Sequence, residues 1–145
     1  MRIIDLIRSK GDDVVTVEPE LTVRGLLAVL AEHHIGAAVV TGPDNAIVGI
    51  VSERDIVRAL ASHGAAILSE HVSAIMTAEV KTCRLDTHVE ELAEAMTEGR
   101  FRHMPVLEDG RLVGIVSIGD VVKSRITELE VERDSLSTYI RTAST

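Results

Sequence analysis

A duplicated segment constrains the fold of this chain more than any other feature of its sequence. GIVSERD at residues 49–55 recurs as GIVSIGD at residues 114–120, a spacing of 65 residues. Upstream, VVTVEPELTVRGLLAVL at 14–30 matches VKTCRLDTHVEELAEAM at 80–96, a spacing of 66 residues. The difference falls in a predicted turn, where TGPDNA is longer than LEDG and where insertions are tolerated. The chain is therefore expected to fold as two copies of one small unit.

Both copies predict the same order of elements. A short strand (14–17; 80–83) precedes an amphipathic helix (about 22–34; about 88–99) with apolar residues at helical spacing. Two apolar runs separated by turn residues then predict an antiparallel hairpin, and a further helix follows it. This β-α-β-β-α order, twice, predicts an α+β protein with two small sheets flanked by helices. Copies of ~60 residues are expected to bury their open sheet faces against each other, across a pseudo-twofold axis.

The chain is predicted to divide at two places. Residues 1–70 hold a short N-terminal helix, the first copy and a linker, residues 71–125 hold the second copy, and 126–145 form a helical extension. SAIM at 73–76 predicts a short helix before the second copy, as DLIR at 5–8 does before the first. The long last helix carries an interrupted apolar stripe: Val122, Ile126, Leu129, Leu136 and Ile140. Such a stripe must pack on something, and a second copy of the chain is the simplest partner.

Composition and charge argue against several classes of function. Apolar residues make up 46% of the chain, but there is one Phe, one Tyr and no Trp, so the core is expected to be aliphatic. The net charge of −8 argues against nucleic acid as a partner, because binding phosphates needs a basic surface. No apolar stretch is long enough for a membrane span, and the N-terminus is too charged for a signal peptide. A single cysteine allows no internal disulfide, which suits a cytoplasmic protein.

A Ser-x-x-Asp pair stands at the start of the last helix of each copy. Ser52 and Asp55 form the first pair, and Ser117 and Asp120 form the second. These side chains can act as helix caps. A carboxylate in the first helical turn can also accept hydrogen bonds from both hydroxyls of a cis-diol, and the free N–H groups of a helix N-terminus favour phosphate. The residues alone leave both interpretations open.

The hairpin that ends in Gly-h-h-Ser-x-x-Asp (h, apolar), with an h-Pro-Val strand before it, resembles the CBS domain. Its two copies in register resemble a CBS domain pair, or Bateman module, from about residue 4 to 125. The second copy matches better, since the first has Ala37-Ala38-Val39 where Met104-Pro105 would be expected. The resemblance implies a cleft that binds AMP, ADP, ATP, NAD(H) or S-adenosylmethionine, and association as disc-shaped dimers.

The resemblance also implies the residues that meet the nucleotide. Asp55 and Asp120 are expected to hold the ribose hydroxyls, and Ser52 and Ser117 to contact ribose or phosphate. Backbone at the first strand and at the start of the second strand of each copy is expected to meet adenine. These positions are Thr16, Val17, Gly36, Ala37 and Ala38 in the first copy, and Thr82, Cys83, His103, Met104 and Pro105 in the second.

The two halves of the predicted cleft differ in their basic residues. Arg54 lies within the first Ser-x-x-Asp element, where the second copy has Gly119. The second copy instead carries Arg100, Arg102 and His103. These basic groups are the predicted phosphate contacts. Two unlike half-sites could hold two nucleotides, or one dinucleotide such as NAD(H).

Other functions find less support in the sequence. Histidines and Cys83 offer metal ligands, but no Cys-x-x-Cys or His-x-x-x-His spacing supports a site, and no metal is expected. Cys83 is expected to be a small buried residue and not a redox thiol. No nucleophile elbow, phosphate loop or acid–base pair suggests an enzyme. Two hypotheses remain: a nucleotide sensor that signals to a protein partner, and a constitutive dimerisation scaffold with an empty cleft.

Overall fold

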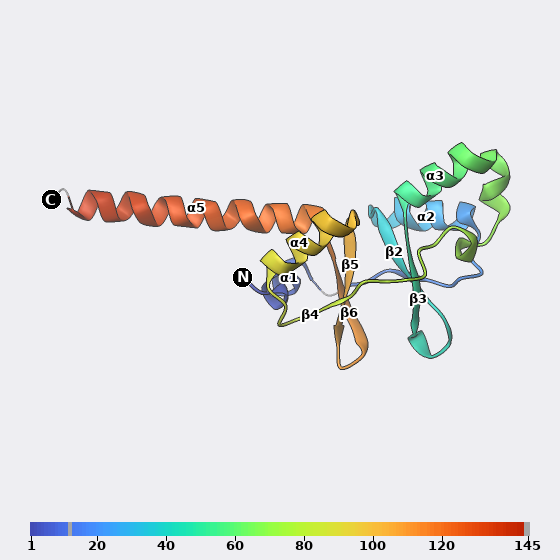
Figure 1. Ribbon diagram of the computed structural model, residues 1–145, viewed down its shortest axis with the longest axis horizontal. Coiled ribbons are helices and arrows are strands. Elements are labelled where there is room, and N and C mark those ends of the chain that lie inside the picture. The colour runs from blue at the N-terminus through green and yellow to red at the C-terminus, as the bar shows by residue number, and fades with distance from the viewer. Residues whose placement is uncertain (12, 144–145) are drawn as a thin grey trace.

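Two three-stranded sheets, one from each copy, form the centre of the computed structural model, which describes residues 1–11 and 13–143 (Figure 1). In the first sheet β1 (Thr16–Val17) runs parallel to β2 (Ala37–Thr41), which pairs antiparallel with β3 (Ile47–Ser52). The second sheet repeats this order and these directions with β4 (Cys83–Arg84), β5 (His103–Glu108) and β6 (Arg111–Ser117). The predicted α+β fold and its duplication are confirmed, with first strands shorter than expected.

The helices begin and end close to the predicted positions. The first copy contains α2 (Val23–His33) and α3 (Glu53–His63), and the second contains α4 (Val89–Gly99) and the start of α5 (Ile118–Ala143). Thr22 caps α2, where its Oγ1 accepts a hydrogen bond from the Gly25 amide at 3.1 Å. This local chemistry explains why the helix starts could be predicted.

The linker between the copies contains more helical structure than expected. It contains two 3₁₀ helices, η2 (Gly64–Ser69) and η3 (Val72–Ala74), and a third, η1 (Pro43–Asn45), lies in the first hairpin turn. The predicted helix at 73–76 is therefore a 3₁₀ turn shifted by a residue. Its counterpart before the first copy is the α-helix α1 (Ile3–Lys10), so the two segments are not structurally equivalent.

The segment before each copy packs on the other copy. Ile3, Leu6 and Ile7 of α1 belong to the same buried cluster as Cys83, Leu92 and Val106 of the second copy. The Ile3 amide donates to the carbonyl oxygen of Thr87 at 2.9 Å. Conversely, Val72 of η3 belongs to the buried cluster of the first copy, and its amide donates to Leu21 O at 2.7 Å. The boundary at residue 70 stays a prediction. The segment that precedes each copy, α1 or η3, packs on the other copy, and we call this the exchange of leading segments.

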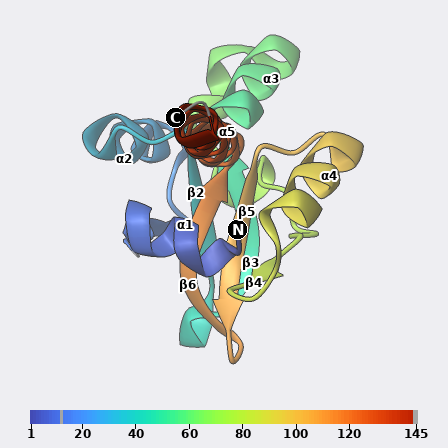
Figure 2. The same ribbon diagram turned by 90° about the vertical axis from the view of Figure 1, so that its left-hand side faces the viewer.

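Helix α5 runs far beyond the sheets (Figure 1), and Figure 2 shows it end-on. Every residue of the predicted apolar stripe is at least half exposed on it: Val122, Ile126, Leu129, Leu136 and Ile140. The stripe therefore has no partner within the described part of the chain. Across residues 1–11 and 13–143, no helix combines the length and apolar character needed to cross a membrane.

Candidate functional site

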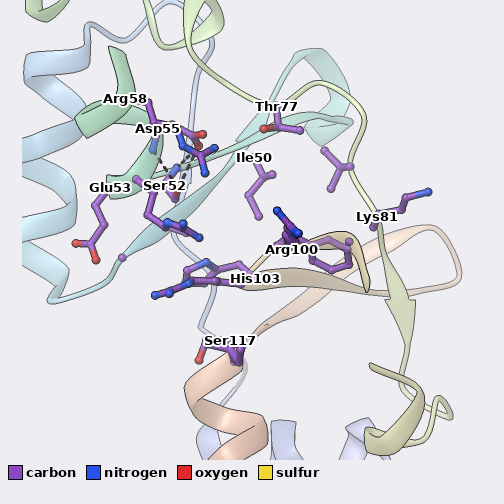
Figure 3. Close-up of a pocket in the computed structure, with 18 of the residues that line it drawn as sticks. Ile50, Ser52, Glu53, Asp55, Arg58, Thr77, Lys81, Arg100, His103 and Ser117 are labelled. Atoms are coloured by element: carbon purple, nitrogen blue, oxygen red, sulfur yellow. Dashed lines mark hydrogen bonds between the residues drawn. The ribbon is translucent and has the colours of Figure 1, made fainter. Parts of the chain in front are cut away.

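A cavity of about 560 Å³ lies between the two copies, within the range of small-ligand sites. Figure 3 shows Ser52 and Asp55 on one side of this cleft and His103 and Ser117 on another. The first strands of the two hairpins, β2 and β5, start close together at this cleft. Gly36 directly precedes β2, and a Cβ placed on it would lie 3.8 Å from Nε2 of His103, the first residue of β5. Eight of the predicted residues line the cleft: Gly36, Ala37, Ser52, Arg54, Asp55, Arg102, His103 and Ser117.

The Ser52–Asp55 pair forms the predicted capping box at the start of α3. Oδ2 of Asp55 accepts the Ser52 amide at 2.8 Å and the Ser52 hydroxyl at 3.1 Å. The Asp55 amide faces Ser52 Oγ at 3.4 Å. Among the described residues, no hydrogen bond is made to Oδ1 of Asp55. The cap thus holds the half-buried carboxylate in place and leaves one oxygen for a further donor, so the two interpretations of this motif are compatible.

Basic side chains line the same cavity as this carboxylate although the whole chain is acidic. Five cationic residues line the cleft, against three acidic ones: Glu53, Asp55 and Glu79. We call the cationic residues the basic cluster: Arg54, Arg58, Lys81, Arg100 and Arg102. Among residues 1–11 and 13–143, none of the five has an ion-pair partner. Unpaired cations converging on one cavity favour an anionic ligand.

His103 differs from the basic cluster in its charge. Burial lowers the pKa of His103 below its usual 6.5, and the positive charge of Lys10 lowers it further, against smaller opposite effects of Asp120 and Glu53. The imidazole is therefore neutral at pH 7. We expect it to donate or accept one hydrogen bond in the cleft, and not to act as the cationic phosphate contact suggested by the sequence.

The second Ser-x-x-Asp pair keeps its cap, but only Ser117 and not Asp120 lines the cleft. Oδ2 of Asp120 accepts the Ser117 amide at 2.8 Å, and the Asp120 amide donates to Ser117 Oγ at 3.1 Å. Nζ of Lys10 also lies 2.6 Å from Asp120 Oδ2. Burial acts to raise the pKa of Asp120, but the hydrogen bonds from Lys10 and Ser117 and the charge of Lys10 lower it. Asp120 is thus an ionised carboxylate with an internal counter-ion.

Eight predicted residues lie outside the cavity lining: Thr16, Val17, Ala38, Thr82, Cys83, Met104, Pro105 and Asp120. Most of these side chains are buried, because successive residues of a strand point to opposite faces. Val17 and Ala38 pack in the core of the first copy, and Cys83 and Met104 in that of the second. Only their backbone groups are left for the predicted adenine contacts. Those contacts stay a prediction.

Several lining residues were not predicted. Arg58 follows Asp55 by three positions on α3, so helical periodicity could have placed both on one face. Lys81 directly precedes a predicted residue. Phe101, the only phenylalanine of the chain, lines the cleft and packs closely over Gly99. No local signal points to Ile50 or Thr77, whose backbones are joined by hydrogen bonds between separate segments.

Pro105 makes the backbone of the two copies unequal beside the cleft. In the first copy the Val39 amide donates to the carbonyl oxygen of Val15 at 3.3 Å. Pro105 occupies the position equivalent to Val39 and has no N–H, so the corresponding bond to the Lys81 carbonyl cannot form. Lys81 lines the cleft. The Lys81 carbonyl therefore does not make this bond, and it lies next to Thr82 and Cys83, where backbone contacts with adenine were predicted.

Cys83 and the histidines form no grouped site. Burial raises the pKa of the Cys83 thiol to about 11, so it is protonated at neutral pH, as a structural residue would be. Its Sγ lies 3.8 Å from the Pro105 carbonyl oxygen. Within the described ranges, three or more His, Cys, Asp or Glu side chains nowhere gather in a way that could hold a metal ion.

Comparison with known proteins places these features in a family. The family model for the CBS domain matches this chain twice, over residues 5–62 and 72–126. The chain belongs to the CBS domain family. Its two copies are a CBS domain pair, and we call them CBS1 and CBS2 from here on.

Solved structures and relatives agree with this assignment. The CBS-domain protein ATU1752 of Agrobacterium tumefaciens is 50% identical, with a TM-score of 0.84 over 86% of this chain and 99% of its own. The mitochondrial CBS domain-containing protein CBSX3 of Arabidopsis thaliana is 35% identical over 96% of this chain and 71% of its own length. PAE2072 of Pyrobaculum aerophilum, solved in complex with AMP, is 32% identical, with a TM-score of 0.77 over 92% of this chain and 99% of its own.

Proposed function

We propose that this CBS pair is a regulatory module, without catalysis of its own, that binds an adenine nucleotide in the cleft. AMP, ADP, ATP and NAD(H) are the candidate ligands. The ribose hydroxyls donate to the carboxylate of Asp55, and the phosphate lies against the basic cluster. Adenine lies between Phe101 and the backbone at Lys81, Thr82 and Cys83. The bound state is transmitted to a protein partner in the cytoplasm.

One observation carries this proposal: in a chain of net charge −8, five cations without an ion-pair partner among the described residues line the same cavity as a capped carboxylate. A nucleoside phosphate needs both groups, an acceptor for its diol and cations for its phosphate. The AMP complex of PAE2072 supports an adenine nucleotide over other phosphates. The cavity volume of about 560 Å³ falls within the range of small-ligand sites.

Thermal unfolding and titration calorimetry with a panel of adenine compounds test the proposal. At a free ligand concentration 100 times the dissociation constant, binding should add about 2.7 kcal/mol to the free energy of unfolding. Arg102→Gln should weaken AMP about tenfold, because a charge-assisted contact to phosphate is lost, and should leave adenosine unchanged. Arg111→Gln removes an equal charge from the far end of β6 and should change neither.

The comparison of AMP with adenosine separates a phosphate contact from a general effect of charge. If Arg102→Gln weakens the binding of AMP and the binding of adenosine equally, the basic cluster does not bind phosphate. If no adenine compound at millimolar concentration raises the melting temperature, the module is not an adenine nucleotide sensor.

The exposed stripe of α5 favours a second candidate, a dimerisation scaffold. Its side chains are at least half exposed, and apolar side chains from both CBS domains add to the exposed surface, such as Val57 and Leu60 of α3. A homodimer would cover such surfaces. A dimer is compatible with nucleotide binding, so the scaffold becomes the function only if the cleft binds nothing.

A further inference from the structure

Lys10 makes the two Ser-x-x-Asp pairs differ in their contacts. Its Nζ donates to Asp120 Oδ2 at 2.6 Å and to the backbone carbonyl oxygen of Ile115 at 2.7 Å. Lys10 and Asp120 are 110 residues apart, and their side chains are only 34% and 23% exposed. Lys10 therefore forms a partly buried ion pair with the carboxylate that, by the family resemblance, is expected to bind ribose.

The exchange of leading segments explains why only CBS2 has such a cation. Helix α1 packs on CBS2, so its last residue, Lys10, lies beside Asp120. On CBS1 the carbonyl oxygen of Ile50, equivalent to that of Ile115, accepts a backbone amide, that of Thr77, at 2.9 Å. The segment there contributes a backbone donor and no cation. Oδ2 of Asp55 therefore accepts only groups of Ser52, whereas Oδ2 of Asp120 also accepts Lys10. Among the described residues, Oδ1 accepts no hydrogen bond in either carboxylate.

The cavity reflects the same difference. Asp55 lines it together with Ser52 and Arg54, whereas on CBS2 the lining includes Ser117, Ile118 and Gly119 but stops short of Asp120. A cis-diol that binds both oxygens of the Asp120 carboxylate would have to displace Lys10 from Oδ2, and so replace a charge-assisted hydrogen bond with neutral donors, which bind a carboxylate less strongly.

We propose that Lys10 is a specificity-determining residue that closes the Asp120 half of the cleft to ribose. The chain then binds one nucleotide, with its ribose on Asp55, and not two. This inference rests on the proposed function and adds the stoichiometry and the orientation of the bound nucleotide.

Calorimetric titration with AMP measures the stoichiometry directly. We expect one AMP per chain for the unmodified protein and two for Lys10→Met, which keeps the length of the side chain and removes its ammonium group. Arg8→Ala is the matched control, because it removes an equal charge from the same helix, at an exposed residue. It should still bind one AMP per chain.

A second pair of variants keeps the test decisive if Lys10→Met folds poorly. Asp55→Asn and Asp120→Asn keep the size of the side chain and an oxygen for the cap. Asp55→Asn should weaken AMP binding by about tenfold or more, because hydrogen bonds to a charged group are lost. Asp120→Asn should change the affinity for AMP by less than about threefold, because Asp120 is proposed to make no contact with the ligand.

Several results would overturn the inference. Two AMP molecules per unmodified chain, or equal losses in Asp55→Asn and Asp120→Asn, would show that Lys10 does not close the site while leaving the proposed function standing. Weaker binding of a single AMP to Lys10→Met would show that Lys10 contacts the ligand. If neither the unmodified chain nor Lys10→Met binds any adenine nucleotide, this inference and the proposed function fail together.

Discussion

At the scale of single residues, burial decides what a reactive side chain can do. Cys83 lies on β4 and its backbone is among those proposed to meet adenine, yet its side chain belongs to the core of CBS2. Desolvation penalises the charged thiolate, so its pKa rises from 9.0 to about 11. Since the thiolate is the reactive form, the residue contributes packing and not redox chemistry.

The reactivity of this thiol gives a direct check. A rise of two pKa units lowers the thiolate fraction at pH 7.5 by about a hundredfold, so the folded protein should react with iodoacetamide at least that much more slowly than the protein in urea. Cys83 is the only cysteine, so the signal needs no assignment. Similar rates for the folded and unfolded protein would place Cys83 at an accessible site and would weaken the assignment of β4 to the core.

At the scale of elements, the spacing along α5 indicates a seam for another helix. Residues 122, 126, 129, 133, 136 and 140 alternate in steps of four and three, the heptad pattern of coiled coils. All are apolar except Arg133, and a polar residue within such a seam can set the register of two chains. The helix alone would leave this face in water, so we propose that α5 pairs with α5 of a second chain.

One matched pair of substitutions tests this pairing. Leu129→Glu puts a charge into the seam, whereas Val131→Glu makes a comparable change on the opposite side of the helix, at a residue 61% exposed. Sedimentation velocity should show that Leu129→Glu shifts the protein from dimer to monomer at micromolar concentration. Val131→Glu should leave the dimer intact. A monomeric unmodified protein, or equal effects of both variants, would contradict pairing through this seam.

At the scale of the whole molecule, the exchanged leading segments tie the two CBS domains together. Ile3 of α1 and Val72 of η3 are both fully buried, each in the core of the copy that does not follow it in sequence. The core of CBS2 thus draws on two distant stretches of chain, 3–7 and 83–121, whereas the core of CBS1 lies within 17–76 and includes the segment that leads into CBS2. The cleft lies between two domains joined in this way, so a change at one domain can reach the other through packed side chains.

Core truncations should reveal the exchange. Ile3→Ala should cost about 2–5 kcal/mol of stability in urea unfolding, because a large buried side chain is removed. In native-state hydrogen exchange, Ile3→Ala should reduce protection mainly in β5 and β6, and Val72→Ala mainly in β2 and β3. The reverse pattern, with each truncation weakening the domain that follows it in sequence, would show that the segments are not exchanged in solution.

Local sequence patterns were enough to predict the elements of this protein. The alternation of apolar residues, the turn residues and the Ser-x-x-Asp caps act over a few positions, so they mark strands, hairpins and helix starts in both copies. The duplication then predicted the paired architecture. Among the predicted residues that line the cleft, Ser52, Asp55 and Ser117 came from the Ser-x-x-Asp motif, whereas Gly36 and Ala37 came only from the resemblance to CBS domains.

Contacts between distant segments were decided only by the tertiary structure. Lys10 meets Asp120 across 110 residues because α1 packs on CBS2, and nothing near either residue in sequence predicts that meeting. The basic cluster likewise draws Arg58, Lys81 and Arg100 from three separate segments. Thus the sequence by itself determined that there are two similar domains with similar caps. The packing of α1 decided that their two carboxylates are not equivalent, because Lys10 forms an ion pair with Asp120, whereas Asp55 has no ion-pair partner among the described residues.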